Sequence, residues 1–107
     1  MLNQVVMVGR LTQDPEIKEL ENGGKVATIT LAVNRSYKNV DGIYETDFIT
    51  CNLHNAIAEN TTEYCKKGDI VGVKGRLQTT RIDDKNVLEV IAERVTFLSS
   101  KKSDEEE

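Results

Sequence analysis

Apolar and polar residues alternate with a period of two through most of this 107-residue chain, and a single segment with helical spacing interrupts the alternation. Alternation rich in β-branched residues is typical of strands that bury one face. The pattern predicts strands over residues 3–12, 25–37, 43–54, 70–82 and 87–98, with a short extended piece over 17–20. The length suits one domain with one modest core. We therefore expect a single all-β domain.

The helical segment follows the third predicted strand. Apolar and small residues recur between positions 57 and 65 with helical spacing. Asn55 is predicted to cap this helix, and Gly68 to end it in a left-handed conformation. Five strands with one helix between the third and the fourth is the order of an OB-fold, a five-stranded Greek-key barrel. Gly72 and Gly75 in the fourth strand fit the bending that closure of such a barrel requires.

The first predicted strand is unusual because Val5, Val6, Met7 and Val8 are apolar on both of its faces. A strand in a small open sheet should leave one face to water. We therefore expect a second subunit to cover part of this strand.

Composition excludes several classes of function. No run approaches the roughly 20 apolar residues that cross a bilayer, and nothing resembles a signal peptide, so we expect a cytoplasmic protein. Cys51 and Cys65 are predicted to be core thiols. Cys51 and His54 leave opposite faces of a strand and cannot form a nucleophile–base pair. We expect no catalytic residue, no metal site and no cofactor.

Charge is unevenly distributed along the chain, whose net charge is −4. Residues 41–63 hold five acids and no base, whereas residues 66–82 hold five bases and one acid. A local basic strip can act as an electrostatic site on an acidic protein, because exposed charges are screened over about 8–10 Å. An ordinary solvated face would give the same pattern, so the strip alone leaves both interpretations open.

Aromatic side chains add a second indication. Tyr44, Phe48 and His54 share the outward face of the third predicted strand, and Tyr37 ends the strand before it. An aromatic ring on an exposed sheet is a platform on which a nucleic-acid base can stack, worth roughly 1–3 kcal/mol per base. The alternative is that Tyr44 and Phe48 pack across the strand pair. Phe97, in the last predicted strand, is expected to face the core.

Several segments resemble the bacterial and phage single-stranded DNA-binding proteins, in order and nearly without gaps from Met1 to about Leu98. The matching segments are Met1-Leu2-Asn3, Val8-Gly9-Arg10-Leu11-Thr12, Asp14-Pro15-Glu16, Ala32-Val33-Asn34-Arg35, Asp47-Phe48-Ile49, Ala58-Glu59-Asn60, Lys67-Gly68 and Gly75-Arg76-Leu77-Gln78-Thr79. The resemblance implies an OB-fold homotetramer, associated with the nucleoid, that wraps single-stranded DNA during replication, recombination and repair.

The resemblance also places the base-stacking positions of the family on Tyr37, Phe48, His54 and Ile82. Ile82 departs from the family pattern because it has no π-face, and it offers either apolar contact to a base or packing within the hairpin. With the cations of the strip and of the matched motifs, the predicted single-stranded DNA site comprises Arg10, Arg35, Tyr37, Phe48, His54, Lys67, Lys74, Arg76, Arg81 and Ile82.

We predict an OB-fold domain over residues 1–100 and a short acidic disordered tail over 101–107. Members of the family commonly end in an acidic, apolar tip that recruits replication and repair proteins. Residues 103–107 are acidic but have no apolar residue, as in a shortened paralogue or a trimmed chain. We therefore do not expect recruitment of partners through the tail. The alternative function is that of an accessory OB protein of a primosome or mobile element, which mainly binds a protein partner and binds DNA weakly.

Overall fold

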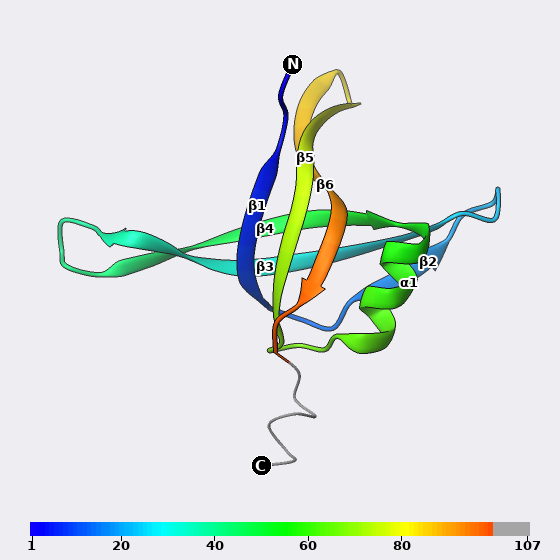
Figure 1. Ribbon diagram of the computed structural model, residues 1–107. Helices are drawn as coiled ribbons and strands as arrows, with labels where there is room; N and C mark the ends of the chain where they lie inside the picture. Colours follow the sequence, from blue (N-terminus) through cyan, green and yellow to red (C-terminus); the bar gives the residue numbers. More distant parts are fainter. Residues whose placement is uncertain (100–107) are drawn as a thin grey trace, which may run out of the picture.

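The computed structural model describes residues 1–99 and has the expected architecture, a β-barrel with one helix between its third and fourth strands (Figure 1). The predicted domain boundary at residue 100 and the predicted tail lie outside the described residues. The elements are β1 (Val5–Leu11), β2 (Glu16–Glu19), β3 (Lys25–Lys38), β4 (Tyr44–His54), α1 (Asn55–Tyr64), β5 (Ile70–Ile82) and β6 (Lys85–Phe97). No helix among these residues is long and apolar enough to span a membrane.

The barrel closes through β1. The strands follow the order β1-β5-β6-β4-β3-β2, and β1 also pairs with β3. β1 runs against β5 from Val5 to Arg10 and meets β3 at Arg10 and Leu11. Gly9 lies at this crossing, where a Cβ atom would stand 2.9 Å from the Ala32 carbonyl oxygen. The short extended piece predicted near residue 17 is β2, which pairs only with β3 and lies outside the barrel.

The alternation predicted from sequence fills the barrel interior. Ile29 and Leu31 from β3, Leu53 from β4 and Val71 from β5 are each fully buried. Cys51 is also buried, and burial raises the pKa of its thiol to about 11. The remaining core residues come from β1, β3, β5, β6, α1 and the position directly after α1, and they are Leu11, Ala27, Ala58, Cys65, Val73, Val90 and Ala92.

Gly75 marks a sharp bend at the middle of β5. The register between β5 and β6 shifts between Lys74 and Gly75, which identifies a β-bulge. A Cβ atom on Gly75 would collide with the carbonyl oxygen of Ile91. The predicted role of this glycine in bending the strand is therefore confirmed, because only a residue without a side chain permits this close approach.

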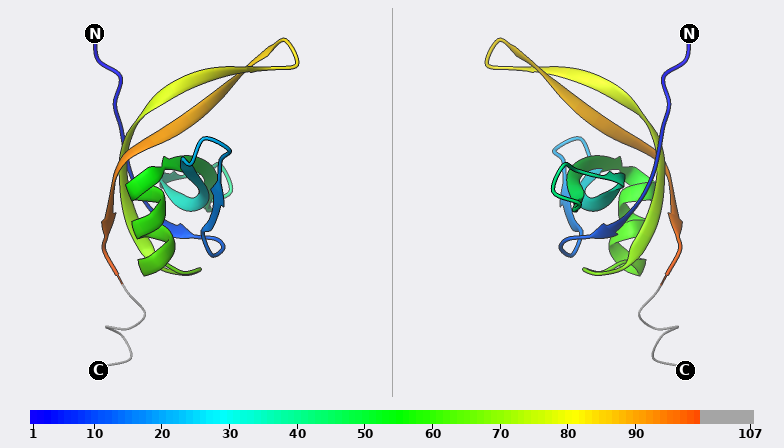
Figure 2. Two further views of the ribbon diagram at one scale, coloured as in Figure 1. Left: turned by 90° about the vertical axis from the view of Figure 1, so that its right-hand side faces the viewer. Right: turned by 90° about the vertical axis from the view of Figure 1, so that its left-hand side faces the viewer.

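Two long hairpins extend from the barrel in different directions (Figures 1 and 2). We call residues 34–46, at the distal end of β3 and β4, the arm. Its turn contains Gly42, with φ +78°, and is ordered by the Asn39 side chain, which accepts hydrogen bonds from the backbone N–H groups of Asp41 and Ile43. The second extension is the β5–β6 hairpin, residues 76–91.

The turn of the β5–β6 hairpin is tighter than expected. A four-residue turn over 83–86 was predicted, but β6 begins at Lys85, directly after Asp83 and Asp84. Both aspartates have positive φ, +50° and +64°, as a two-residue type I′ turn requires. Asn-Gly is the usual sequence for such a turn, so Asp-Asp gave only a weak signal for it.

Both predicted ends of the helix were wrong. His54, not Asn55, is the N-cap residue, and no side chain caps α1. The Asn55 side chain instead accepts a hydrogen bond of 3.1 Å from the backbone N–H of Lys25, so it ties the helix to β3. Cys65 is the C-cap residue in extended conformation. Gly68, with φ +95°, belongs to the following turn and does not end the helix.

Phe97 lies on the inward side of β6, as predicted, but it is not buried in the core. Its side chain is 43% exposed and lies against Tyr64 at the end of α1, with 6.0 Å between the ring centroids. Phe97 stands opposite the buried Val71, so period-two alternation gave its side correctly, but at the last residue of β6 the ring lies at the rim of the barrel and stays partly exposed.

Candidate nucleic-acid interface

The outer face of β3 and β4 carries the exposed rings that the sequence predicted. Phe48 is 68% exposed and stands opposite Ala32, whose small side chain leaves one side of the ring uncovered. Next to this pair, the Thr30 and Thr50 hydroxyls lie 3.2 Å apart. His54 is exposed at the end of the same face, opposite Val26. Phe48 is thus available for stacking and does not pack across the strand pair.

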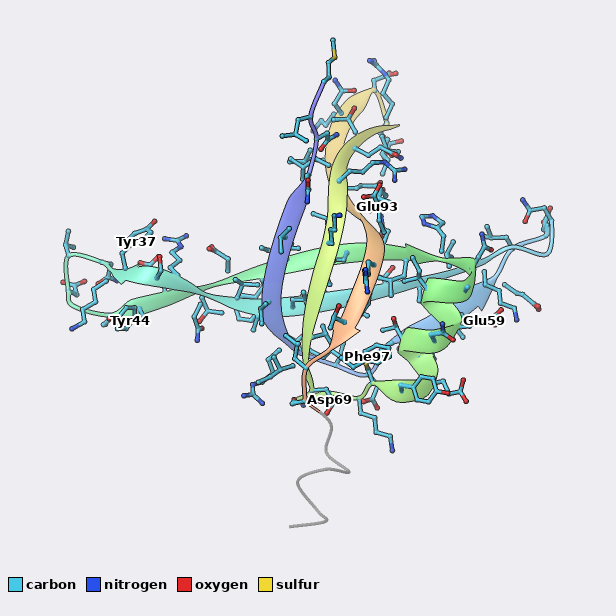
Figure 3. The ribbon with its side chains drawn as sticks, in the orientation of Figure 1. Tyr37, Tyr44, Glu59, Asp69, Glu93 and Phe97 are labelled. Atoms are coloured by element: carbon cyan, nitrogen blue, oxygen red, sulfur yellow. The ribbon has the colours of Figure 1, made fainter. Side chains whose placement is uncertain are left out.

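On the arm, the same face of β4 continues to Tyr44. Lys38 stands opposite Tyr44, with its ammonium nitrogen 5.6 Å from the ring centroid, a cation–π distance. Tyr37 is also exposed, by 64%, but it projects from the other side of the arm (Figure 3). The predicted aromatic residues therefore do not form one flat platform. A DNA strand that contacts both tyrosines must pass around the arm.

Ile82 lies apart from these rings. It is 51% exposed near the end of the β5–β6 hairpin, opposite Lys85. Because the hairpin and the arm extend in different directions (Figure 2), Ile82 would contact a different part of a bound strand from Phe48.

Three of the predicted cations have no carboxylate partner within residues 1–99, namely Arg10, Lys67 and Lys74. Arg10 donates a 2.7 Å hydrogen bond to the Gly68 carbonyl oxygen, which brings it to the loop that carries Lys67. The backbone N–H of Lys67 donates to the Asp14 carboxylate at 2.7 Å. Arg10 also stands opposite Ala32, in the cross-strand row that ends at Phe48. This row joins a free cation to the exposed ring.

The other three predicted cations are paired with acids. Arg76 binds Glu93 at 3.2 Å and Arg81 lies 4.0 Å from Asp84. Arg35 binds Asp47 at 2.9 Å and also binds Glu45. The Arg35 guanidinium holds the pKa of the Asp47 carboxyl below its ordinary value, mainly through their hydrogen bonds, and the same contacts raise the pKa of Arg35. The basic strip seen in the sequence is therefore partly neutralised by residues from other segments.

Sequence reasoning did not select two exposed cations that the structure places near the predicted ones. Lys38 lies over the Tyr44 ring, as described above. Arg94 of β6 stands directly opposite Lys74 of β5, and neither has a carboxylate partner among the described residues. Counting residues outward from the turn at Asp41-Gly42 would have placed Lys38 opposite Tyr44, and this was the available signal for Lys38. No local signal identified Arg94, because its register depends on the bulge at Gly75.

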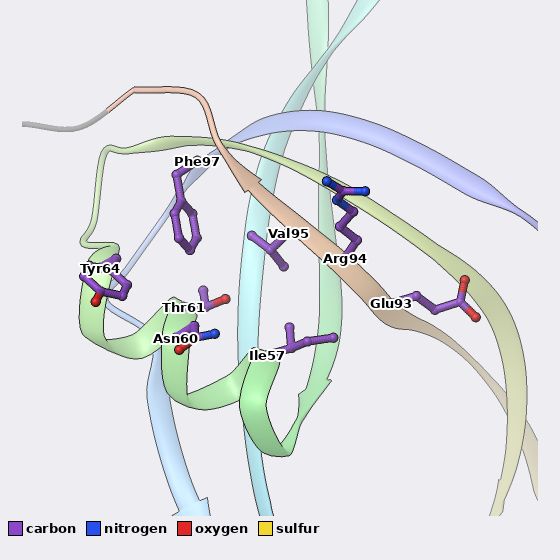
Figure 4. A pocket seen from close by; sticks show the side chains of 8 residues that line it. All are labelled: Ile57, Asn60, Thr61, Tyr64, Glu93, Arg94, Val95 and Phe97. Carbon is purple, nitrogen blue, oxygen red and sulfur yellow. The ribbon is translucent and has the colours of Figure 1, made fainter.

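A groove of about 440 Å³ lies between α1 and the end of β6 (Figure 4). Tyr64 and Phe97 close one end of it, and Ile57 and Val95 line its middle. The Thr61 hydroxyl is buried without a hydrogen-bond partner. The described residues contain no group of three or more acidic, His or Cys side chains placed to hold a metal ion.

Several known proteins to which this chain is similar bear the name of one family. Residues 2–98 match the model of the Single-strand binding protein family. Over 106 residues the chain is 47% identical to Single-stranded DNA-binding protein B of Bacillus subtilis (strain 168), covering 94% of this chain and 94% of that protein. It is 50% identical to Single-stranded DNA-binding protein A of the same bacterium, of which it covers only 62%. With Single-stranded DNA-binding protein 2 of Staphylococcus aureus (strain COL) it shares 46% identity over 99% of this chain and 80% of the relative.

Proposed function

This chain belongs to the single-strand binding protein family, and we propose that it binds single-stranded DNA without sequence preference and protects it during replication, recombination and repair. It acts as a binding protein, not as an enzyme. The main support is the uncovered Phe48 ring in a row with Arg10 on one outer face of the barrel. Sequence-independent binding to single strands needs two elements, rings that stack on bases and cations that neutralise phosphates.

Nine of the ten predicted residues form the proposed site, with different weights, whereas Arg35 is engaged by two carboxylates. Phe48, Tyr37 and His54 supply exposed rings, and Ile82 supplies apolar contact at the β5–β6 hairpin. Arg10, Lys67 and Lys74 are the cations most available to phosphates, since none has a carboxylate partner within the described residues. Arg76 and Arg81 must share their charge with an acid. Lys38 and Arg94 extend the site.

A titration of the protein with oligo-dT at two salt concentrations, followed by fluorescence, tests this proposal. We expect tight binding. The logarithm of the binding constant should fall linearly with log[salt], with a slope of about −0.7 for each phosphate neutralised. A duplex of equal length is the control and should bind far more weakly. Weak binding to both nucleic acids would contradict the proposal. That outcome would favour an accessory OB protein whose main partner is another protein, a function for which the names of the relatives offer no support.

We propose further that the working form is a homotetramer built partly through β1. Val6 and Val8 are 69% and 54% exposed on one face of that strand. From Val5 to Gly9, β1 pairs on one side only within residues 1–99. A second copy could cover both the apolar face and the unpaired strand edge. Sedimentation at micromolar concentration should show a tetramer, and a monomer would contradict the assembly without affecting the proposal of DNA binding. We place this activity in the cytoplasm, at the nucleoid.

A further inference from the structure

Arg35 lies at the centre of a continuous chain of polar contacts along one side of the arm. Its Nε donates to both Asp47 oxygens, at 3.3 and 3.1 Å, and its Nη2 donates to Asp47 Oδ1 at 2.9 Å. Its Nη1 donates to Glu45 Oε2 at 2.6 Å. Both arms of the guanidinium fork are therefore engaged by carboxylates of the neighbouring strand.

The chain of contacts continues to the tip of the arm. The second oxygen of Glu45 accepts a 3.0 Å hydrogen bond from the Asn39 side-chain amide. The oxygen of that amide accepts from the backbone N–H groups of Asp41 and Ile43 in the turn, at 2.9 and 3.0 Å. A single path of hydrogen bonds thus links β4 at the barrel to the turn through Arg35.

This path occupies the side of β4 opposite Phe48. Alternation along the strand places Glu45 and Asp47 on one face, and Tyr44, Thr46 and Phe48 on the other. Asp47 stands opposite Val33, whereas Thr46 stands opposite Asn34 and donates a hydrogen bond of 2.8 Å to it. Arg35 is therefore on the side that does not carry the Phe48 ring.

The arm depends on these contacts because it has few others. It extends beyond the barrel, and its larger apolar residues are exposed, including Tyr37, Ile43 and Tyr44. The β3–β4 register is also interrupted between Asn34 and Lys38. A two-stranded ribbon without a core needs side-chain contacts to fix its twist.

From this geometry we infer that Arg35 is a positioning residue, which holds the arm in the conformation that presents Tyr44 and Tyr37 to the DNA strand, and that it does not bind phosphate. This inference deepens the proposed function and rests on it. A phosphate at the Nε and Nη2 edge of the guanidinium would have to displace Asp47, and one at Nη1 would compete with Glu45. The pair of acids also leaves one net negative charge at this site, which is unfavourable for a phosphate.

Substitution of Arg35 by lysine separates the two roles. Lysine keeps the positive charge that a phosphate contact needs, but it has no planar fork to bind Asp47 and Glu45 together. For a positioning residue we expect Arg35→Lys to weaken binding of oligo-dT about threefold, because a smaller fraction of molecules holds the competent arm. The salt dependence should stay unchanged. Wild-type affinity in this variant would overturn the inference.

Substitution of Asp47 is a second test, because the two roles of Arg35 predict changes of opposite sign in the affinity for DNA. Removing a negative charge beside bound DNA should ordinarily tighten binding, and it would free Arg35 for a phosphate. A positioning role predicts that Asp47→Asn weakens binding instead, to about the extent of Arg35→Lys. The control is Lys74→Gln, which should lower the salt slope by about 0.7 because one phosphate contact is lost. Tighter binding by Asp47→Asn would overturn the inference.

Amide hydrogen exchange without DNA provides a readout that does not depend on binding. Residues 37–46 should exchange faster in both Arg35→Lys and Asp47→Asn, and as slowly as in the wild type in Lys74→Gln. Unchanged exchange in the arm variants would contradict the positioning role even if their affinities fall. If wild-type protein does not bind single strands, the proposed function fails, and the exchange result still decides whether Arg35 orders the arm.

Discussion

The arm and the β5–β6 hairpin are both two-stranded extensions of the same barrel, but they present different chemistry. The arm and its base carry exposed rings, Tyr37, Tyr44 and Phe48. The hairpin carries exposed aliphatic side chains, including Ile82 and Leu88. Aromatic rings stack on bases, whereas aliphatic groups offer only apolar contact. We therefore expect the arm and its base to supply most of the base contacts.

The two extensions also keep their shape by different means. A polar chain from Asp47 through Arg35 and Glu45 holds the arm. The hairpin is continuous with the barrel strands in an almost unbroken register, and its bend comes from the bulge beside Gly75. We therefore expect backbone geometry to set the path of the hairpin, and side-chain contacts to hold that of the arm. The following predictions test this difference.

The largest expected effect is on the hairpin. Gly75→Ala should lower the free energy of unfolding by about 3 kcal/mol, because its Cβ would collide with the Ile91 backbone and the bulge would have to move. Chemical denaturation measures this loss. Gly72→Ala is the matched control in the same strand. Its Cβ would come no closer than 3.6 Å to another atom, so we expect a change within about 0.5 kcal/mol. Equal stability of the two variants would contradict the account of the bend.

The next effect is on binding by the exposed rings. Phe48→Ala should weaken binding of oligo-dT by roughly 1–3 kcal/mol per contacted base, with little change in melting temperature. Leu88→Ala of the hairpin is the control, because its side chain is exposed to nearly the same extent, 65% against 68%. We expect it to bind almost as the wild type does. If the two variants lose equal affinity, ring stacking does not distinguish the arm from the hairpin.

A ring added to the hairpin should reduce the difference between the two extensions. Ile82→Trp is expected to tighten binding by about 1 kcal/mol, since it supplies a stacking surface at a position that is half exposed. The salt slope should stay the same because no cation is added. Affinity and melting temperature are measured together. Unchanged affinity with a lower melting temperature would show that Ile82 belongs to the packing of the hairpin.

The smallest effect concerns acid pH and should be confined to the arm. The pKa of Asp47 is lower in the folded protein than its ordinary value, through its hydrogen bonds to Arg35. A lowered folded-state pKa gives stability that is fully present above the ordinary value, near 3.9, and is lost as pH falls through the folded value. Amide exchange in the arm, corrected for intrinsic rates, should therefore be constant from about pH 5 to 8 and rise below about pH 4. Loosening already at pH 6 would contradict this assignment.

Much of the fold was predictable because it depends on neighbours along the chain. Alternation over 25–37 predicted a strand with one buried face, and Ile29 and Leu31 of this strand lie in the core. Predictions that depended on a contact between distant segments were less successful. Asn55 was expected to cap the helix, but it accepts a hydrogen bond from Lys25 of β3. Phe97 has the predicted inward side but stays partly exposed, because its ring meets only the end of the helix at Tyr64 instead of a closed core.

In the candidate site too, features set within one strand were predictable and contacts between distant segments were not. The positions of the rings on β4 followed from strand alternation, and Phe48 is exposed as predicted. The availability of the cations did not follow, because a charge on one strand is neutralised by acids that another strand brings close. Arg76 meets Glu93 of β6, and Arg35 meets two acids of β4. Arg94 becomes a neighbour of Lys74 only through the register that the bulge creates.

The sequence by itself determined the order of the elements, the buried face of β3 and β4 and the family, since these depend on local pattern and on motifs spread along the chain. Tertiary structure alone decided which cations are free, where the two hairpins point and how the arm is held. The physical reason is that hydrophobic alternation acts within one strand, whereas ion pairs and close backbone contacts require atoms from segments far apart in the chain. The barrel brings those segments together.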